Sequence, residues 1–188
     1  MKIICVLGSP REKGNSSLIV KKFCEVAGNR GANIESFTLN SLNFKGCQGC
    51  MTCKDKTDRC VVKDDLTQVL DSIYESDILV LASPVYMGGV SGQLKCFLDR
   101  TFSFLTPDFK TSSNPSRLPK GKKALIVTTQ GAPENMFRDV AQQVEMMLDR
   151  HGFSEVKTIR GCEIRDIGDA EKDNKIMDMA AKAAEQLV

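Results

Sequence analysis

Four cysteines within fourteen residues make metal chemistry the first question to ask of this chain. They are Cys47, Cys50, Cys53 and Cys60, with the spacing C-x2-C-x2-C-x6-C. Three thiols in one tight run are typical of iron–sulfur ligation, and Gly46 and Gly49 give the backbone freedom to curl around a cluster. The fourth cysteine comes later than in the two-cluster ferredoxin run and no proline follows it. The pattern therefore favours an iron–sulfur centre without specifying its type.

Two other interpretations of the cysteine run stay open. Zinc is usually held by two C-x2-C pairs separated by a dozen or more residues, so the single tight run disfavours it. The run could also carry free thiols or a disulfide. The chain has 8 cysteines and no recognisable secretion signal, which predicts a reducing, cytoplasmic location with thiols free or bound to metal.

A second group of candidate residues lies in the segment from Gly8 to Ser17, between an apolar run and a helical pattern. Unpaired N–H groups at a helix start favour an anion there. Five side chains supply further donors suited to a phosphate: Ser9, Arg11, Asn15, Ser16 and Ser17. The segment has neither the lysine of the nucleoside-triphosphatase loop nor the G-x-G-x-x-G of dinucleotide sites, so it predicts a mononucleotide. The simpler alternative is a strand-to-helix turn with capping serines.

Two more loops follow apolar runs and suit a flat ring. The first holds Pro84, Val85, Tyr86, Met87 and Gly88, and the second holds Thr129, Gln130 and Gly131. Glycine permits close backbone approach, and an aromatic ring and a thioether can pack beside a planar ligand. Taken alone, Tyr86 and Met87 would be ordinary loop packing. Next to a phosphate loop, they predict a ring-binding site.

The elements that must position these loops alternate along the chain. Strands are expected at residues 2–7, 33–39, 77–82, 123–129 and 156–164, and helices at 15–27, 64–74, 92–105, 135–151 and 169–187. Such alternation demands a parallel sheet with helices on both faces. The prediction is an α/β, flavodoxin-like three-layer sandwich with a five-stranded parallel sheet in the order 2-1-3-4-5. We expect one domain over residues 1–188, with the cysteine loop 46–60 inserted after the second strand.

Composition excludes several classes of function. The chain has 188 residues, and a formal net charge of +2 gives no basic surface that indicates nucleic-acid binding. No apolar run approaches membrane length, so no membrane partner is expected. The only histidine, His151, is predicted to be a surface residue at a helix end, which makes histidine acid–base catalysis unlikely to be part of the function. The irregular, basic stretch 106–121 fits a lid, a subunit contact or a solvated loop.

Together the motifs resemble those of a known family. Gly8-Ser9-Pro10-Arg11 with Gly14-Asn15-Ser16, and Ser83-Pro84-Val85-Tyr86 with Ser91-Gly92 and Asp99-Arg100, resemble the NADPH-dependent FMN reductases, which are flavodoxin-like flavoproteins. The cysteine run followed by Val61-Val62-Lys63-Asp64-Asp65 is similar to the iron–sulfur flavoprotein branch of that family.

The resemblance implies cofactors and roles. FMN would bind by its phosphate at Ser9, Arg11, Asn15, Ser16 and Ser17, with the ring against residues 84–88, and the four cysteines of the run would ligate a 4Fe–4S cluster. The implied function is an FMN-dependent oxidoreductase that passes electrons between a small-molecule or protein donor and acceptor, with NAD(P)H as a possible co-substrate. The flavin does the chemistry, so no catalytic side chain is expected. A homodimer or homotetramer is implied.

Two alternative functions stay open. One is a cluster-free NAD(P)H-dependent FMN or quinone reductase, in which the cysteine loop is only structural. The other is a non-enzymatic redox carrier or sensor.

Overall fold

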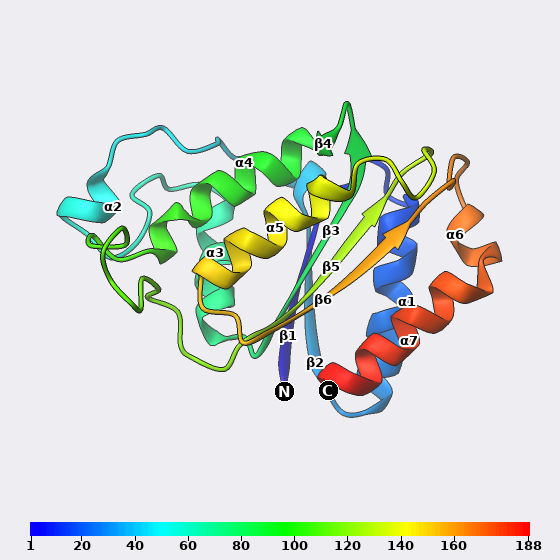
Figure 1. Cartoon of the computed structure of the whole chain (residues 1–188). Coiled ribbons are helices and arrows are strands. Elements are labelled where there is room, and N and C mark those ends of the chain that lie inside the picture. Colours follow the sequence, from blue (N-terminus) through cyan, green and yellow to red (C-terminus); the bar gives the residue numbers. More distant parts are fainter.

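Five parallel strands form the central sheet of the computed structural model, which describes all 188 residues (Figure 1). Their bounds are β1 Lys2–Leu7, β2 Asn33–Thr38, β3 Ile78–Tyr86, β5 Lys123–Thr129 and β6 Glu155–Gly161. The order β2-β1-β3-β5-β6 corresponds to the predicted order 2-1-3-4-5, so the fold prediction is confirmed. The fold is flavodoxin-like, with the strand order reversing between β1 and β3.

A sixth, two-residue strand was not predicted. β4 (Gly89–Val90) pairs antiparallel with the end of β3, which runs to Tyr86 rather than ending near residue 82. Met87 and Gly88 between them have positive φ values of 48° and 75°, the backbone that a two-residue hairpin turn requires. The hairpin therefore extends β3 beyond the sheet.

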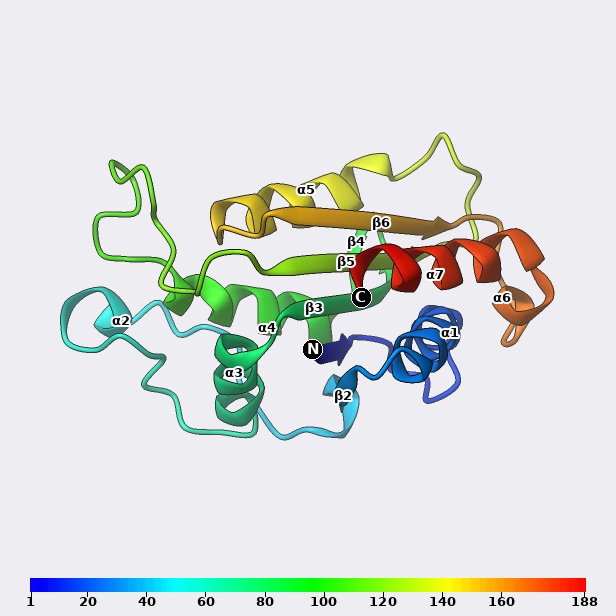
Figure 2. The same cartoon turned by 90° about the horizontal axis from the view of Figure 1, so that it is seen from below.

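Helices cover both faces of the sheet (Figures 1 and 2). One layer contains α1 (Asn15–Asn29), α6 (Asp169–Lys172) and α7 (Asn174–Leu187), and the other contains α3 (Leu66–Glu75), α4 (Gly92–Arg100) and α5 (Arg138–Arg150). Short 3-10 turns lie at Leu39–Ser41 and Thr101–Phe104, and α2 (Thr52–Asp55) lies in the cysteine loop. Every helix is too short or too polar to span a lipid bilayer.

The apolar core is divided by the sheet into two halves. In β1, Ile3 and Cys5 pack with the α1 and α7 side, whereas Ile4 and Val6 pack with the α3 and α4 side. Successive side chains of a strand point to opposite faces, so a strand covered on both faces is apolar throughout. This is why the continuous apolar runs of the sequence predicted the sheet correctly.

Three helices differ from the prediction by more than two residues, and each does so for a local reason. The last helix is divided at Asp173, whose carboxylate accepts a hydrogen bond from the Ile176 N–H at 3.1 Å and so begins a new helix. The helix expected at 92–105 ends at Arg100 and continues as a 3-10 turn. α5 begins at Arg138, because Phe137 before it is left-handed with a φ of 55°.

The prediction that His151 lies at the surface was wrong. The side chain is buried against the ring of Phe104, with 5.8 Å between the ring centroids. Its Nδ1 lies 2.5 Å from the Met147 carbonyl and its Nε2 lies 3.0 Å from the Thr101 carbonyl. His151, which directly follows α5, turns inward between a carbonyl of α5 itself and the Thr101 carbonyl of the neighbouring 3-10 turn.

We predict that His151 makes folding stability fall in mild acid. Burial lowers the pKa of the imidazole below its ordinary value of 6.5 and outweighs the two carbonyl contacts. Just below pH 6.5 the unfolded chain therefore binds more protons than the folded protein. As the pH falls through this range, the free energy of unfolding decreases by at most about 1.4 kcal/mol per pH unit. Below the lower pKa of His151 in the folded protein, both states are protonated and this residue causes no further loss of stability.

Denaturant unfolding between pH 7 and pH 5 measures this slope, and the variant His151→Gln should lose it. His151 is the only histidine, so one imidazole NMR resonance reports its pKa in the wild-type protein. A midpoint at or above 6.5 would contradict the prediction.

Candidate functional site

The parallel register brings three predicted loops to one edge of the sheet. Leu7 pairs with Ala82, and Ala82 pairs with Val127, so β1, β3 and β5 end side by side. A pocket of about 290 Å³ lies at their carboxyl ends. Its lining consists of Ser9, Arg11, Gly14, Asn15, Ser16, Pro84, Val85, Tyr86, Thr129, Gln130, Gly131, Ile164 and Arg165.

Ten of the thirteen residues expected to bind the cofactor line this pocket. The exceptions are Ser17, one position along α1 from Ser16, and Met87 and Gly88, which form the turn of the β3–β4 hairpin. Met87 is fully exposed at the tip of that turn. Ile164 and Arg165 were missed. The only feature of the sequence that could have indicated them is their position at the end of the last predicted strand, on the same carboxyl edge of the sheet.

The first loop is shaped by contacts within itself. The Ser9 hydroxyl accepts a hydrogen bond from the Arg11 N–H and donates one to the Arg11 carbonyl, both at 3.1 Å. The Gly14 N–H also donates to that carbonyl, at 3.0 Å. A Cβ at Gly14 would collide with the Ser9 hydroxyl, so the close approach requires glycine.

Ser16 is the residue that most clearly points to a ligand. It lies in the first turn of α1 and is buried, and its hydroxyl has no hydrogen-bond partner in the chain. A buried polar group without a partner costs free energy, so most such groups in folded proteins are satisfied. At the start of a helix, N–H groups and the helix dipole favour an anion. An anion in this pocket would satisfy the hydroxyl.

Asn15 holds another segment of the chain. Its side-chain oxygen accepts hydrogen bonds from the N–H groups of Gly168 and Ala170 at 3.1 and 3.2 Å, and its amide donates to the Asp166 carbonyl at 2.8 Å. These bonds bring the loop after β6 against the start of α1. Arg165 is thereby placed at the pocket, where its Nε donates to the Gly131 carbonyl at 3.2 Å.

Another loop of the pocket also has an unsatisfied buried atom. The Gln130 amide nitrogen donates to the carbonyls of Ala132, Pro133 and Met136, whereas its Oε1 is buried with no partner. An N–H group of a ligand would satisfy this acceptor. Tyr86 stands partly exposed on the pocket wall. One loop thus offers a donor and helix N–H groups for a phosphate, and another offers an acceptor for a ring N–H, so the residues present fit FMN.

Buried serines join the loops. The Ser91 hydroxyl donates to the Gly8 carbonyl at 2.7 Å and accepts from the Leu94 N–H at 3.2 Å. The Ser91 N–H donates to the Ser83 hydroxyl at 2.8 Å. The phosphate loop, the hairpin and the start of α4 therefore share one hydrogen-bonded network.

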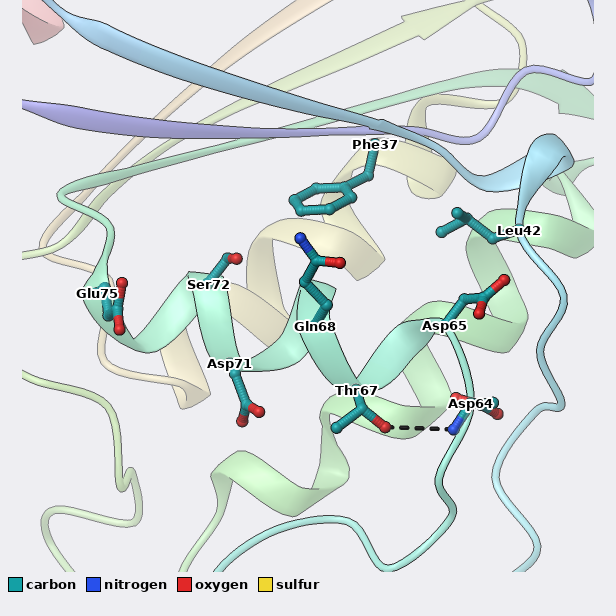
Figure 3. Close-up of a pocket in the computed structure, with 9 residues that line it drawn as sticks. All are labelled: Phe37, Leu42, Asp64, Asp65, Thr67, Gln68, Asp71, Ser72 and Glu75. Carbon is teal, nitrogen blue, oxygen red and sulfur yellow. Dashed lines mark hydrogen bonds between the residues drawn. The ribbon is translucent and has the colours of Figure 1, made fainter.

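A larger hollow of about 600 Å³ lies over α3, away from this edge (Figure 3). Its lining is rich in carboxylates, with Asp64, Asp65, Asp71 and Glu75 around Thr67 and Gln68. An acidic wall repels a phosphate. The pocket at the strand ends, where the three predicted loops meet, is the candidate site.

The cysteine segment, residues 46–60, runs along α4: Gly46 lies beside Cys96, and Cys47 lines a hollow together with Gly89, Val90 and Lys95. In Figures 1 and 2, α2 stands near the C-terminal end of α4, whereas the pocket loops lie near its N-terminal end. Cys47 and Cys50 are exposed, and Cys53 and Cys60 are partly buried. All 8 cysteines are free thiols. No three cysteine, histidine or acidic side chains lie close enough together to hold a metal ion.

Basic side chains tie this segment to the body of the protein. Lys54 donates to the carbonyls of Phe102 and Leu105 at 2.6 and 2.7 Å and stacks over the Phe102 ring. Arg117 donates to the carbonyls of Cys53 and Ser103, each at 2.9 Å. The basic stretch 106–121 thus contacts the cysteine segment.

Comparison with known proteins agrees with this geometry. The sequence profile of the NADPH-dependent FMN reductase family matches residues 1–159. The chain is 39% identical over 101 residues to an iron–sulfur flavoprotein of Methanocaldococcus jannaschii, covering 54% of this chain and 52% of that protein. It is 35% identical over 153 residues to an iron–sulfur flavoprotein of Methanosarcina thermophila, covering 81% of this chain and 75% of that protein.

The coverage of relatives is uneven. The match spans 52% of the Methanocaldococcus protein and 47% of an iron–sulfur flavoprotein of Archaeoglobus fulgidus, so the chain matches about half the length of these two relatives.

Solved structures support the fold. The chain superposes on an NAD(P)H:quinone oxidoreductase from Methanothermobacter marburgensis with a TM-score of 0.77, covering 100% of this chain and 96% of that one at 17% identity. At that identity the likeness concerns the fold alone. With the profile match over most of its length and a flavodoxin-like sheet, the chain belongs to the NADPH-dependent FMN reductase family.

Proposed function

We propose that this chain is an FMN-dependent oxidoreductase that passes electrons between a reduced donor and an acceptor, with FMN in the pocket at the strand ends. The observation that carries the proposal is the buried, unpartnered hydroxyl of Ser16 at the start of α1. A phosphate oxygen is the acceptor that this position suits. Bound FMN supplies the redox chemistry, namely hydride or single-electron exchange.

The side chains of the pocket bind and orient the cofactor. The start of α1 and Ser16 would hold the phosphate, and Arg11 and Arg165 would offset its negative charge. The free oxygen of Gln130 would accept a hydrogen bond from the flavin ring. Tyr86 and the exposed Met87 lie at the rim. A donor or acceptor would approach from that open side.

No side chain is needed as a nucleophile or base. The only histidine is buried in contact with Phe104 and does not line the pocket. This supports chemistry that resides in the cofactor.

A 4Fe–4S cluster at Cys47, Cys50, Cys53 and Cys60 is the second part of the proposal. The free state of all four thiols, the short spacing and the names of the relatives support it. The four sulfurs are not gathered in the structure, so cluster binding requires the segment to rearrange. The family resemblance also suggests a homodimer or homotetramer, which sedimentation of the loaded protein measures.

The phosphate site is tested by Ser16→Ala. A hydrogen bond to a charged group contributes about 1.5–3 kcal/mol, so the affinity for FMN should fall by a factor of about 10 to 100. The affinity for riboflavin, which lacks the phosphate, should stay the same. The variant loses no hydrogen bond in the empty protein, so its free energy of unfolding should not decrease.

Quenching of flavin fluorescence measures both affinities. Ser17→Ala is the matched control, because Ser17 is the next residue of the same helix and does not line the pocket. Equal weakening of FMN and riboflavin binding, or no change for either, would show that Ser16 does not hold a phosphate.

The cluster is tested by metal analysis of anaerobically purified protein. We expect about four iron and four acid-labile sulfide per FMN. Cys50→Ala should lose most of both and keep FMN, because the pocket lies at the other end of α4. Cys162→Ala is the matched control, since Cys162 lies outside the segment and follows β6.

Three results would contradict the cluster: FMN without iron and sulfide, one equivalent of zinc, or a disulfide within the segment. The cluster-free NAD(P)H-dependent FMN or quinone reductase would then be the better description. Steady-state turnover with NAD(P)H separates either enzyme from a redox carrier or sensor.

A further inference from the structure

A buried cation at the end of α4 contacts the cysteine segment. Arg100 is the last residue of α4, and its side chain is fully buried. Taking a charged group out of water is costly unless partners compensate it. The groups that compensate the buried charge of Arg100 therefore indicate its structural role.

Arg100 makes five hydrogen bonds, as many as its guanidinium has N–H donors. Nε donates to the Cys60 sulfur at 3.1 Å. Nη1 donates to Asp64 Oδ2 at 2.7 Å and to the Lys45 carbonyl at 2.8 Å. Nη2 donates to the Val62 carbonyl at 2.8 Å and to Asp64 Oδ1 at 3.2 Å. The ion pair with Asp64 is bidentate, which fixes the plane of the guanidinium.

These partners lie on both sides of the cysteine segment. Lys45 immediately precedes it, Cys60 ends it, and Val62 and Asp64 follow. The Asp64 carboxylate also accepts from the Lys45 N–H at 3.1 Å and from the Leu66 N–H at 3.1 Å. One side chain thus closes the segment into a loop and attaches both of its ends to α4.

The other three cysteines have no such anchor. Cys47 and Cys50 are exposed, and positive φ values of 63° at Gly49 and 58° at Met51 turn the backbone between Cys47 and Cys53. Their sulfurs have weaker partners near the surface: the Gly49 N–H lies 3.5 Å from the Cys47 sulfur, Thr52 interacts with the Cys50 thiol, and the half-buried Lys54 interacts with Cys53. Of the four cysteines, only Cys60 is held by a buried donor.

We propose that Arg100 is the positioning residue of the cysteine segment. It fixes both ends of the segment and the Cys60 sulfur before any metal is present, so that cluster binding rearranges only the residues between them. The first half of this proposal concerns the metal-free chain, and the second half rests on the proposed cluster.

Hydrogen exchange of metal-free, FMN-loaded protein tests the first half. Arg100→Lys keeps the positive charge but has only three donors on one atom. We expect the amides of Lys45 and Leu66, which bond to Asp64, to exchange at least about tenfold faster. Arg117→Lys is the matched control, because Arg117 bonds the middle of the segment at Cys53 and not its ends.

Iron release from the anaerobically purified protein to a chelator tests the second half. We expect Arg100→Lys to release iron about tenfold faster than the wild-type protein. Cys60→Ala should contain little iron after purification. Asp64→Asn removes the ion pair while keeping the shape of the side chain. Like Arg100→Lys, this variant should speed up both amide exchange and iron release. It replaces Arg100→Lys in both experiments if that variant does not fold.

Unchanged exchange at Lys45 and Leu66 would overturn the positioning role. A uniform rise in exchange across the sheet would overturn it as well, because it would show only a loss of global stability. Wild-type protein without iron would refute the proposed cluster and the second half, whereas the exchange result would still decide the first.

Discussion

The pairing of β1, β3 and β5 is the constraint on which the rest of this molecule depends. Because the strands are parallel and in register, Leu7, Ala82 and Val127 are neighbours, and the chain leaves all three strands at one edge. The loops that begin there must satisfy their own polar groups, and Ser83 and Ser91 do so through buried hydrogen bonds. Two buried side-chain atoms without partners, the Ser16 hydroxyl and the Gln130 Oε1, belong to residues of the pocket. The parallel pairing of the strands thus places the loops that form the binding site.

α4 connects this edge to the cysteine segment. Its N-cap, Ser91, belongs to the network of the pocket loops, and its last residue, Arg100, holds the ends of the segment. Nine helical residues at 1.5 Å each separate the two by about 13 Å. The helix is packed against the sheet by Leu94 and Phe97. The distance between Ser91 and Arg100 is therefore set by one rigid helix, while Cys47 at the start of the segment lines a hollow together with Gly89 and Val90.

Local patterns were enough to predict the fold and most of the pocket, because strands buried on both faces are apolar throughout and their loops follow directly. The errors at helix ends are local, whereas the errors that concern the sites involve contacts between distant parts of the chain. Arg165 reaches the pocket through hydrogen bonds that join Asn15 to a loop 151 residues away. His151 looked like an exposed helix end, and Thr101 makes it a buried residue. The role of Arg100 depends in the same way on Asp64, 36 positions earlier, and no local pattern shows that pairing.

The contrast between the two candidate sites has a physical cause. The pocket is formed without its ligand because its walls are the ends of buried strands, and packing stabilises them whether or not FMN is present. The cysteine segment contributes only a four-residue helix, and two of its sulfurs are exposed. Gathering four thiolates there would bring like charges together and bury little apolar surface, so nothing in the metal-free chain favours that arrangement. Metal–sulfur bonds can supply the missing free energy, since metal binding and local folding are coupled. Fixing the ends of the segment beforehand, as Arg100 does, reduces the conformational entropy that those bonds must overcome.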